Sequence, residues 1–259
     1  MQLSKEYSIR GVTRDASKPK AQALAKKGVE IVTADMNHKD SIISAIKGSD
    51  TAFLVTNYWE TGDPEVEKAQ GKTVADASKE VGVKHLIFSS LLNATQISSG
   101  RLSHAKHFDS KAEIEEHIRS LGIPATFVVA GYYMSNYLQM LRKRDDGSYS
   151  LAYPVSKEAK FPLVETVQDM GKFVKPALKK PDAFNGKRIF AATDYYPFTQ
   201  VTADQYKSFL PDSMAQEMLE NHLLIEEPGL FDGISLQESL DALEDKPTTW
   251  KEFVKNARV

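Results

Sequence analysis

The first 130 residues alternate between short apolar segments and amphipathic helical segments, and this alternation restricts the fold more than any other feature. The segments 51–56 (TAFLVT), 84–90 (KHLIFSS) and 125–129 (ATFVV) are almost continuously apolar. Strands of this kind need cover on both faces, so they indicate a parallel sheet between layers of helices. We therefore predict an α/β fold with a doubly wound, mostly parallel sheet.

The second half of the chain loses this regular alternation. Its pattern predicts helices over 132–142, 164–178, 205–222 and 249–255, and strands over 149–153 and 187–192. We expect two regions: a sheet domain over 1–130 and a smaller α+β cap over 131–259. Ligands of parallel sheets bind beyond the carboxyl ends of the strands, so candidate site residues are sought there.

The amino-acid composition excludes several classes of function and of binding site. The 259 residues carry 33 Lys+Arg against 35 Asp+Glu, a net charge of -2, which argues against direct nucleic-acid binding. There is no cysteine, which excludes disulfides, thiolate metal sites and cysteine nucleophiles. The histidines show no metal-ligand spacing, so no metal site is expected. No apolar run approaches the ~18 residues of a membrane span and no leader is visible, so we expect a cytoplasmic or nuclear protein.

Several strings match one known family. They are GVTRD at 11–15, VTNYWE at 55–60, QGK at 70–72, HFDSK at 107–111 and WKEF at 250–253. With them the chain resembles the NmrA-like family, atypical relatives of the short-chain dehydrogenase/reductases, from about Tyr7 to the C-terminus. The resemblance implies a Rossmann-like fold that binds NADP.

The resemblance leaves three functions open. The first is a redox-sensing regulatory protein that acts through a protein partner such as a transcription factor. The second is an NADPH-dependent oxidoreductase with a small-molecule substrate. The third is a scaffold that has lost the cofactor.

One part of the family pattern is missing. Family members begin with a strand, a glycine-rich turn and a helix, but here six residues precede Tyr7 and the 14 glycines are scattered. The missing turn is the one that cradles a dinucleotide diphosphate. The missing strand would lie between 7–13 and 51–56, so we predict a gap or a closed-up sheet there. An unpaired strand edge would favour a homodimer.

The resemblance implies that Arg14, with Thr13, clamps the 2′-phosphate of NADP, a group that suits a guanidinium. The alternative is a surface arginine at a helix entrance capped by Asp15. The remaining residues that the resemblance assigns to adenine, ribose and nicotinamide are Asp35, Met36, Thr56, Asn57 and Tyr58. For these the alternative is ordinary polar turns and packing.

His107 and Lys111 lie one helical turn apart, where classical short-chain reductases carry Tyr-x-x-x-Lys. The resemblance implies that Lys111 holds a ribose hydroxyl, while His107 would take the place of the catalytic tyrosine. Gly131, Tyr132 and Tyr133 follow the strand 125–129, where the family places the nicotinamide; Tyr132 or Tyr133 could donate a proton. The alternatives are a solvated helix face and core aromatics. Lys111, Tyr132 and His107 are therefore the candidate catalytic residues.

Overall fold

The computed structural model describes residues 6–140, 142–143, 149–150, 153–156, 158–197 and 211–256. Contacts divide the chain into two compact units, each built from three segments. Unit 1 comprises Met1–Ser89, Glu113–Phe127 and Val174–Arg188, and unit 2 comprises Ser90–Ala112, Val128–Phe173 and Ile189–Val259. The units therefore interleave along the chain, whereas the sequence suggested one boundary after residue 130.

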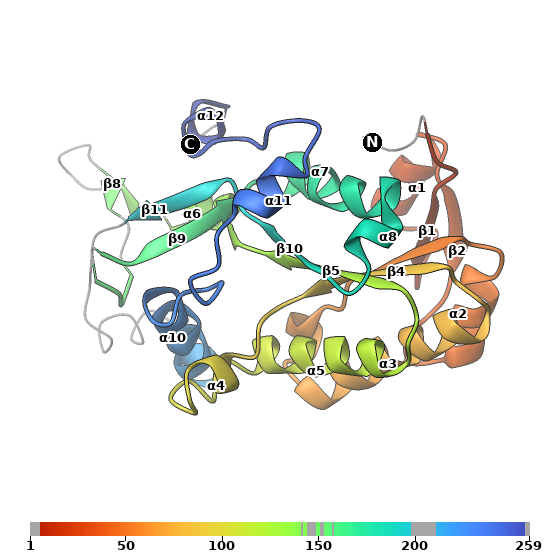
Figure 1. Cartoon of the computed structure of the whole chain (residues 1–259), viewed down its shortest axis with the longest axis horizontal. Coiled ribbons are helices and arrows are strands. Elements are labelled where there is room, and N and C mark those ends of the chain that lie inside the picture. The colour runs from red at the N-terminus through yellow and green to blue at the C-terminus, as the bar shows by residue number, and fades with distance from the viewer. Residues whose placement is uncertain are drawn as a thin grey trace. The chain divides into compact units, whose positions relative to one another are not determined.

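The first half of the chain forms the alternating elements that its pattern predicts. In order they are β1 (Arg10–Thr13), α1 (Pro19–Ala25), β2 (Glu30–Thr33), α2 (Lys39–Ile46), β3 (Thr51–Leu54), the 3-10 turn η1 (Tyr58–Glu60), α3 (Pro64–Glu80), β4 (His85–Ser90), α4 (Ala94–Ile97), α5 (Lys106–Ser120) and β5 (Ala125–Ala130) (Figure 1). Asn93 caps the short α4 by accepting a hydrogen bond from the Gln96 N–H at 2.8 Å.

The strands confirm the α/β class with a mostly parallel sheet. One sheet has the order β10-β5-β4-β3, where β10 is Arg188–Ala191, and β3 runs parallel to β4. β1 and β2 form a separate parallel pair in the register Thr13↔Thr33. Among the described strands, β1 and β3 thus each lack a neighbour on one side. Among the strands that the structure describes, the sheet is therefore interrupted, and not closed up, next to 51–56.

Unit 1 has its own apolar core, made by helices packing on β3, β4 and the start of β5. Leu86, Phe88, Ile118 and Phe127 are all below 1% exposed. Gly71 of α3 lets that helix approach α5 closely, because a Cβ there would come within 2.5 Å of the Ile114 side chain. In Figure 1, α2 and α3 lie on one side of β4 and β5, and α8 (Pro181–Phe184) lies on the other.

Unit 2 is built around a different core, rich in aromatic side chains. It contains the three-stranded sheet β11-β9-β6, in which β9 (Lys160–Val164) is antiparallel to β11 (Asp194–Pro197) and parallel to β6 (Tyr132–Tyr133). The remaining elements are α6 (Met134–Met140), β7 (Arg142–Lys143), β8 (Tyr149–Ser150), α7 (Thr166–Lys179), α10 (Asp212–Glu226), α11 (Gln237–Asp241) and α12 (Trp250–Asn256).

The sequence-based prediction of one helix over 132–142 is wrong in part. Tyr132 and Tyr133 pair with Leu163 and Val164 of β9, so the helix begins only at Met134. A long-range strand partner therefore overrides the helical pattern of this segment. The predicted helix 205–222 is seen as α10 from Asp212; residues 205–210 lie outside the described part of the chain.

Candidate functional site

The carboxyl ends of β1 and β2 bring together four of the residues assigned to the adenosine end of NADP. Because the strands are paired at Thr13↔Thr33, Arg14 and Asp35 follow neighbouring strand ends. The Arg14 guanidinium lies 2.5 Å from a Glu60 carboxylate oxygen, and its side chain is 53% exposed. Arg14 is thus a solvent-facing cation held at a strand end, a geometry that suits a phosphate ligand.

The turns after β1 and β2 are ordered by their own polar side chains. The Thr13 hydroxyl lies 3.3 Å from both the N–H and the carbonyl oxygen of Asp15. One Asp35 carboxylate oxygen accepts hydrogen bonds from the Asn37 N–H at 2.9 Å and the Asn37 side chain at 2.8 Å. Met36 packs against the core of unit 1. These turns are therefore compatible both with adenosine binding and with the plain structural alternative.

The segment after β3 is partly buried. The Thr56 hydroxyl donates to the Glu67 carboxylate at 2.6 Å, and both residues are buried. Asn57 is exposed and precedes η1, whereas Tyr58 is only 3% exposed. Tyr58 meets the exposed ring of Trp59 edge-on at 5.0 Å. Asn57 and Trp59 are therefore exposed members of this segment, as is Val55.

In unit 2, His107 lies at the start of α5 and is paired with the largely buried carboxylate of Glu217. Its Nδ1 lies 2.7 Å from Glu217 of α10, and the histidine is 8% exposed. One helical turn earlier, the His104 Nδ1 lies 2.6 Å from Glu220. A carboxylate hydrogen-bonded to Nδ1 fixes the orientation of the ring. Lys111, one turn after His107, is half-buried.

Close backbone packing explains why position 131 is a glycine. Its N–H donates to the Ala191 carbonyl oxygen at 3.0 Å, and a Cβ at this position would collide with the Pro162 carbonyl oxygen. The close approach of three chain segments therefore requires glycine here. A nearby nicotinamide would be a second reason for the same residue.

Tyr132 and Tyr133 differ in their surroundings. Tyr132 is 8% exposed, and its hydroxyl lies 3.2 Å from the Tyr153 hydroxyl and 3.3 Å from His222 Nε2. Burial raises the pKa of Tyr132, so its hydroxyl stays protonated at neutral pH. Tyr133 is 44% exposed and is the more accessible of the two.

The residues at the ends of β1 and β2 fit the adenosine end of a nicotinamide dinucleotide better than its diphosphate. Arg14, Thr13, Asp35 and Met36 offer a cation, polar groups and an apolar side chain beside one strand pair. The diphosphate normally rests on a glycine-rich turn, and the sequence contains no such glycine cluster. The ends of β1 and β2 therefore present groups that suit an adenosine phosphate, which stays a prediction.

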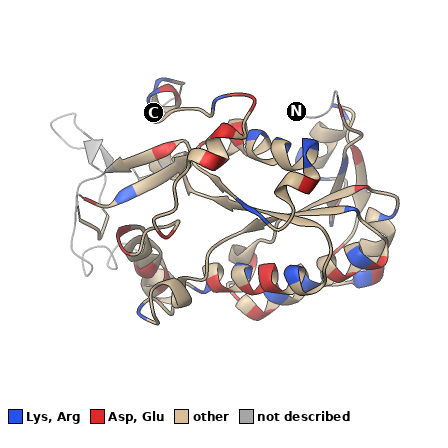
Figure 2. Cartoon of the chain, viewed as in Figure 1, with Lys and Arg blue, Asp and Glu red and all other residues tan. Residues whose placement is uncertain are grey.

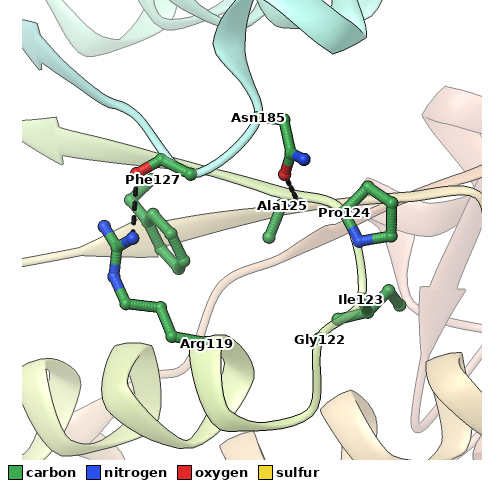
Figure 3. Close-up of a pocket in the computed structure, with 8 residues that line it drawn as sticks. Arg119, Gly122, Ile123, Pro124, Ala125, Phe127 and Asn185 are labelled. Carbon is green, nitrogen blue, oxygen red and sulfur yellow. Dashed lines mark hydrogen bonds between the residues drawn. The ribbon is translucent and has the colours of Figure 1, made fainter.

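A small pocket of about 220 Å³ lies elsewhere in unit 1, at the amino end of β5 (Figure 3). The Arg119 guanidinium stacks over the Phe127 ring at 4.1 Å and donates to the Gly186 carbonyl oxygen at 2.8 Å. Arg119 also contacts Glu115 at 2.8 Å. Because its cation is already paired, this pocket is not the candidate site.

The surface charges of unit 1 are mixed. Figure 2 shows lysine and arginine interspersed with aspartate and glutamate along α2 and α3. Within the described ranges, no three histidine or acidic side chains come together as metal ligands. None of the helices described is both long and apolar enough to cross a membrane.

Four acidic residues near the candidate side chains were given no role in the site from the sequence. They are Glu60, Glu67, Glu217 and Glu220. His104 and His107 are three residues apart, and so are Glu217 and Glu220, which is the spacing that lets the two pairs match. The spacing was visible in the sequence, but the pairing of helices more than 100 residues apart was not.

Comparison with known proteins identifies the family. The model of the NmrA-like family matches residues 1–207. The NmrA-like family domain-containing oxidoreductase malD of Malbranchea aurantiaca is 35% identical over 221 residues, which cover 77% of this chain and 64% of malD. The oxidoreductase lnaB of Aspergillus flavus is 30% identical over 217 residues, covering 77% and 64%. The match thus spans about two thirds of these relatives' length.

Solved structures agree in fold. The negative transcriptional regulator NmrA in complex with NADP superposes with a TM-score of 0.81 at 19% identity, covering 98% of this chain and 89% of that one. The NADPH-dependent quinone oxidoreductase QOR2 of Escherichia coli, complexed with NADPH, gives 0.74 at 22% identity, covering 98% and 92%. The matched family model and the identity to malD together establish that this chain belongs to the NmrA-like family.

Proposed function

We propose that this chain binds NADP(H) and acts as an oxidoreductase on a small molecule. The observation that carries the cofactor proposal is Arg14, an exposed guanidinium at the carboxyl end of β1 beside the end of β2. A cation at this point of a doubly wound sheet favours the 2′-phosphate of NADP over the 2′-hydroxyl of NAD. The Glu60 carboxylate holds the guanidinium in place until a phosphate competes for it.

The oxidoreductase role is supported by two independent facts. The relatives malD and lnaB are named oxidoreductases. The buried pair of His107 and Glu217 supplies an acid–base group on the same helix face as Lys111. In this proposal Lys111 holds the ribose, while His107 and Tyr132 are the proton-donor candidates. The cofactor would supply the hydride.

A second function is a redox-sensing regulator that acts through a protein partner. The solved structure of NmrA, named a negative transcriptional regulator and bound to NADP, favours it through the shared fold. A regulator needs to bind the dinucleotide but not to turn it over. The two functions therefore share the cofactor site and differ in chemistry.

The test is NADPH consumption with a panel of carbonyl and enone compounds, followed by absorbance of the reduced cofactor. We expect turnover by the natural chain and its loss in Lys111→Met. Binding without turnover, read from quenching of Trp59 fluorescence, would favour the regulator. If neither binding nor turnover is detected, the third function, a scaffold that has lost the cofactor, is favoured.

A further inference from the structure

Two glutamates of α10, Glu217 and Glu220, bind the start of α5 within unit 2. The Oε1 atom of Glu217 lies 2.7 Å from His107 Nδ1 and also accepts the His107 backbone N–H at 3.2 Å. Glu220 repeats this arrangement just before α5, where it accepts the His104 N–H at 2.6 Å and lies 2.6 Å from His104 Nδ1. Each glutamate therefore contacts both the backbone and the ring of one histidine.

The two pairs differ in their exposure to solvent. In the first pair, the side chains of Glu217 and His107 are 14% and 10% exposed. In the second pair, Glu220 is 5% exposed but His104 is 59% exposed. The His107 ring also meets the buried ring of Phe108 edge-on at 4.7 Å. The ring of His107 is therefore packed in place, whereas the ring of His104 faces solvent.

The contact with Glu217 determines which ring nitrogen of His107 carries the hydrogen. A carboxylate oxygen accepts hydrogen bonds, and the same oxygen of Glu217 already accepts the backbone N–H of His107. The neutral ring therefore donates from Nδ1 and keeps its lone pair on Nε2. A proton that His107 gains or releases is consequently exchanged at Nε2.

This assignment matters because His107 and Lys111 lie one helical turn apart on α5. In the proposed oxidoreductase, Lys111 holds the ribose and His107 is a proton-donor candidate. Proton transfer is efficient only when the donor atom is held in one place relative to the acceptor. A residue that fixes the ring of His107 would therefore contribute to the reaction without touching the substrate.

Glu217 also has a purely structural explanation. A carboxylate that accepts an N–H at the first turn of a helix stabilises the helix start. Glu220 offers an internal comparison, because it makes the same two contacts from the same helix but with an exposed histidine. Both glutamates lie outside residues 1–207, the part of the chain that the family model matches.

We propose that Glu217 is a positioning residue for His107, which keeps the hydrogen on Nδ1 and makes Nε2 the atom that donates a proton. The proposal rests on the oxidoreductase function proposed above. When a carbonyl group is reduced, the N–H bond at Nε2 of the protonated ring breaks and its proton goes to the carbonyl oxygen. The carbonyl carbon gains the hydride that NADPH supplies, and a proton from water then returns to Nε2.

The first test reads the position of the hydrogen directly. Long-range ¹H–¹⁵N correlation spectra of the ¹⁵N-labelled full chain, in alkaline solution, distinguish hydrogen on Nδ1 from hydrogen on Nε2 for the six histidines. The signal that disappears in His107→Gln identifies His107. We expect its hydrogen on Nδ1, and hydrogen on Nε2 in the natural chain would overturn the proposal.

Variants of Glu217 test the cause of this preference. Glu217→Ala should allow the hydrogen of His107 to populate Nε2, because the acceptor at Nδ1 is gone. Glu217→Gln should keep it on Nδ1, since the amide oxygen still accepts a hydrogen bond. Glu220→Ala is the matched control, because it removes the same two contacts from His104 and should leave the spectrum of His107 unchanged. A His107 spectrum that is the same in Glu217→Ala as in the natural chain would overturn the proposal.

The second test is turnover of NADPH with a carbonyl compound that the natural chain reduces. Glu217→Ala should lower kcat by about tenfold or more with the KM for NADPH almost unchanged, because a general acid loses its orientation. Glu217→Gln should recover most of kcat, and Glu220→Ala should stay close to the natural chain. Circular dichroism checks that each variant is folded. Equal losses of kcat in the two alanine variants would show a structural role only and would overturn the proposal.

Failure of this proposal and failure of the proposed function give different results. Binding of NADPH without any turnover by the natural chain would refute the oxidoreductase function and, with it, the use of Nε2 as a proton donor. The spectra decide separately whether Glu217 keeps the hydrogen on Nδ1. Full turnover in both His107→Gln and Glu217→Ala would overturn the positioning role and leave the oxidoreductase function standing.

Discussion

His222 lies inside the aromatic cluster of unit 2, and its burial links that core to pH. Its ring stacks on Tyr153 with centroids 4.7 Å apart, and its Nδ1 donates to the Met218 carbonyl oxygen at 2.7 Å. Burial lowers the pKa of His222 to about 4 from an ordinary value of 6.5. The folded protein therefore holds this ring neutral at pH values where the unfolded chain would protonate it.

The free energy of unfolding should fall as the pH drops from about 6.5 to about 4. In that pH range His222 is protonated in the unfolded state but not in the folded state, so acid favours unfolding. The resulting loss in the free energy of unfolding is at most about 3 kcal/mol. Urea titrations at pH 7 and pH 5 measure this change in the free energy of unfolding. His222→Gln, which cannot titrate, should lose this part of the dependence. An unchanged slope in the variant would show that His222 is not its source.

Gly71 shows how a single residue sets the distance between two helices. A methyl group there would lie 2.5 to 2.8 Å from three side-chain carbons of Ile114. We expect Gly71→Ala to lower the free energy of unfolding by about 1–3 kcal/mol, as overpacking of a core does.

The control for Gly71→Ala is a double-mutant cycle with Ile114→Ala, measured by urea unfolding. With the isoleucine gone, the added methyl group has room, and alanine is the better helix former. Gly71→Ala should then be neutral or stabilising. A loss of the same size in both backgrounds would mean that the contact with Ile114 is not the cause.

At the scale of elements, Glu115 joins α5 to the start of β10. It is 1% exposed and accepts hydrogen bonds from Arg119 at 2.8 Å and from Arg188 at 2.9 Å. Both arginines reach solvent, which reduces the cost of leaving them unpaired.

Glu115→Ala should lower the free energy of unfolding by about 2 kcal/mol, because the charge-assisted hydrogen bonds from Arg119 and Arg188 to a buried carboxylate disappear. Chemical denaturation measures the change. Glu113→Ala, two residues away on the same helix, removes an exposed partner of Lys68 and should cost less than about 1 kcal/mol. Equal effects of the two substitutions would contradict the role given to Glu115.

Sequence reasoning captured the elements of the first half because their signals are local. Asp63 caps α3 by accepting a hydrogen bond from the Glu65 N–H at 2.8 Å, and Gly28, Gly48 and Gly82 follow helices and have positive φ. The second half depends on long-range pairing. β9 and β11 were not predicted, since their pairing with each other depends on residues about 30 positions apart along the chain.

The candidate site was predictable as a set of strand ends but not in its contacts. The parallel pairing of β1 and β2 could be expected from the alternation, and with it the proximity of Arg14 and Asp35. The ion pair of Arg14 with Glu60 and the hydrogen bond of His107 with Glu217 join segments that are far apart in the sequence. Local sequence patterns do not predict such contacts. The cofactor and catalytic roles of these residues stay predictions.

At the scale of the whole molecule, two compact units each contain a core of their own, and the sheet of the first is interrupted. The chain spans about 64% of the length of malD and lnaB. The fold is that of the NmrA-like family, while the diphosphate cradle is absent from this sequence. We predict that Arg14 makes the adenosine-phosphate end of the cofactor a main source of affinity.

The most direct measurement is calorimetric titration of the natural chain and Arg14→Ala with NADP, NAD and adenosine 2′,5′-bisphosphate. We predict that NADP and the bisphosphate bind with similar affinity, since both carry the 2′-phosphate that Arg14 meets, and that NAD binds more weakly. Arg14→Ala should weaken the two 2′-phosphate ligands about tenfold or more and leave NAD almost unchanged. No heat with any ligand, or an equal loss for NADP and NAD in the variant, would contradict the account.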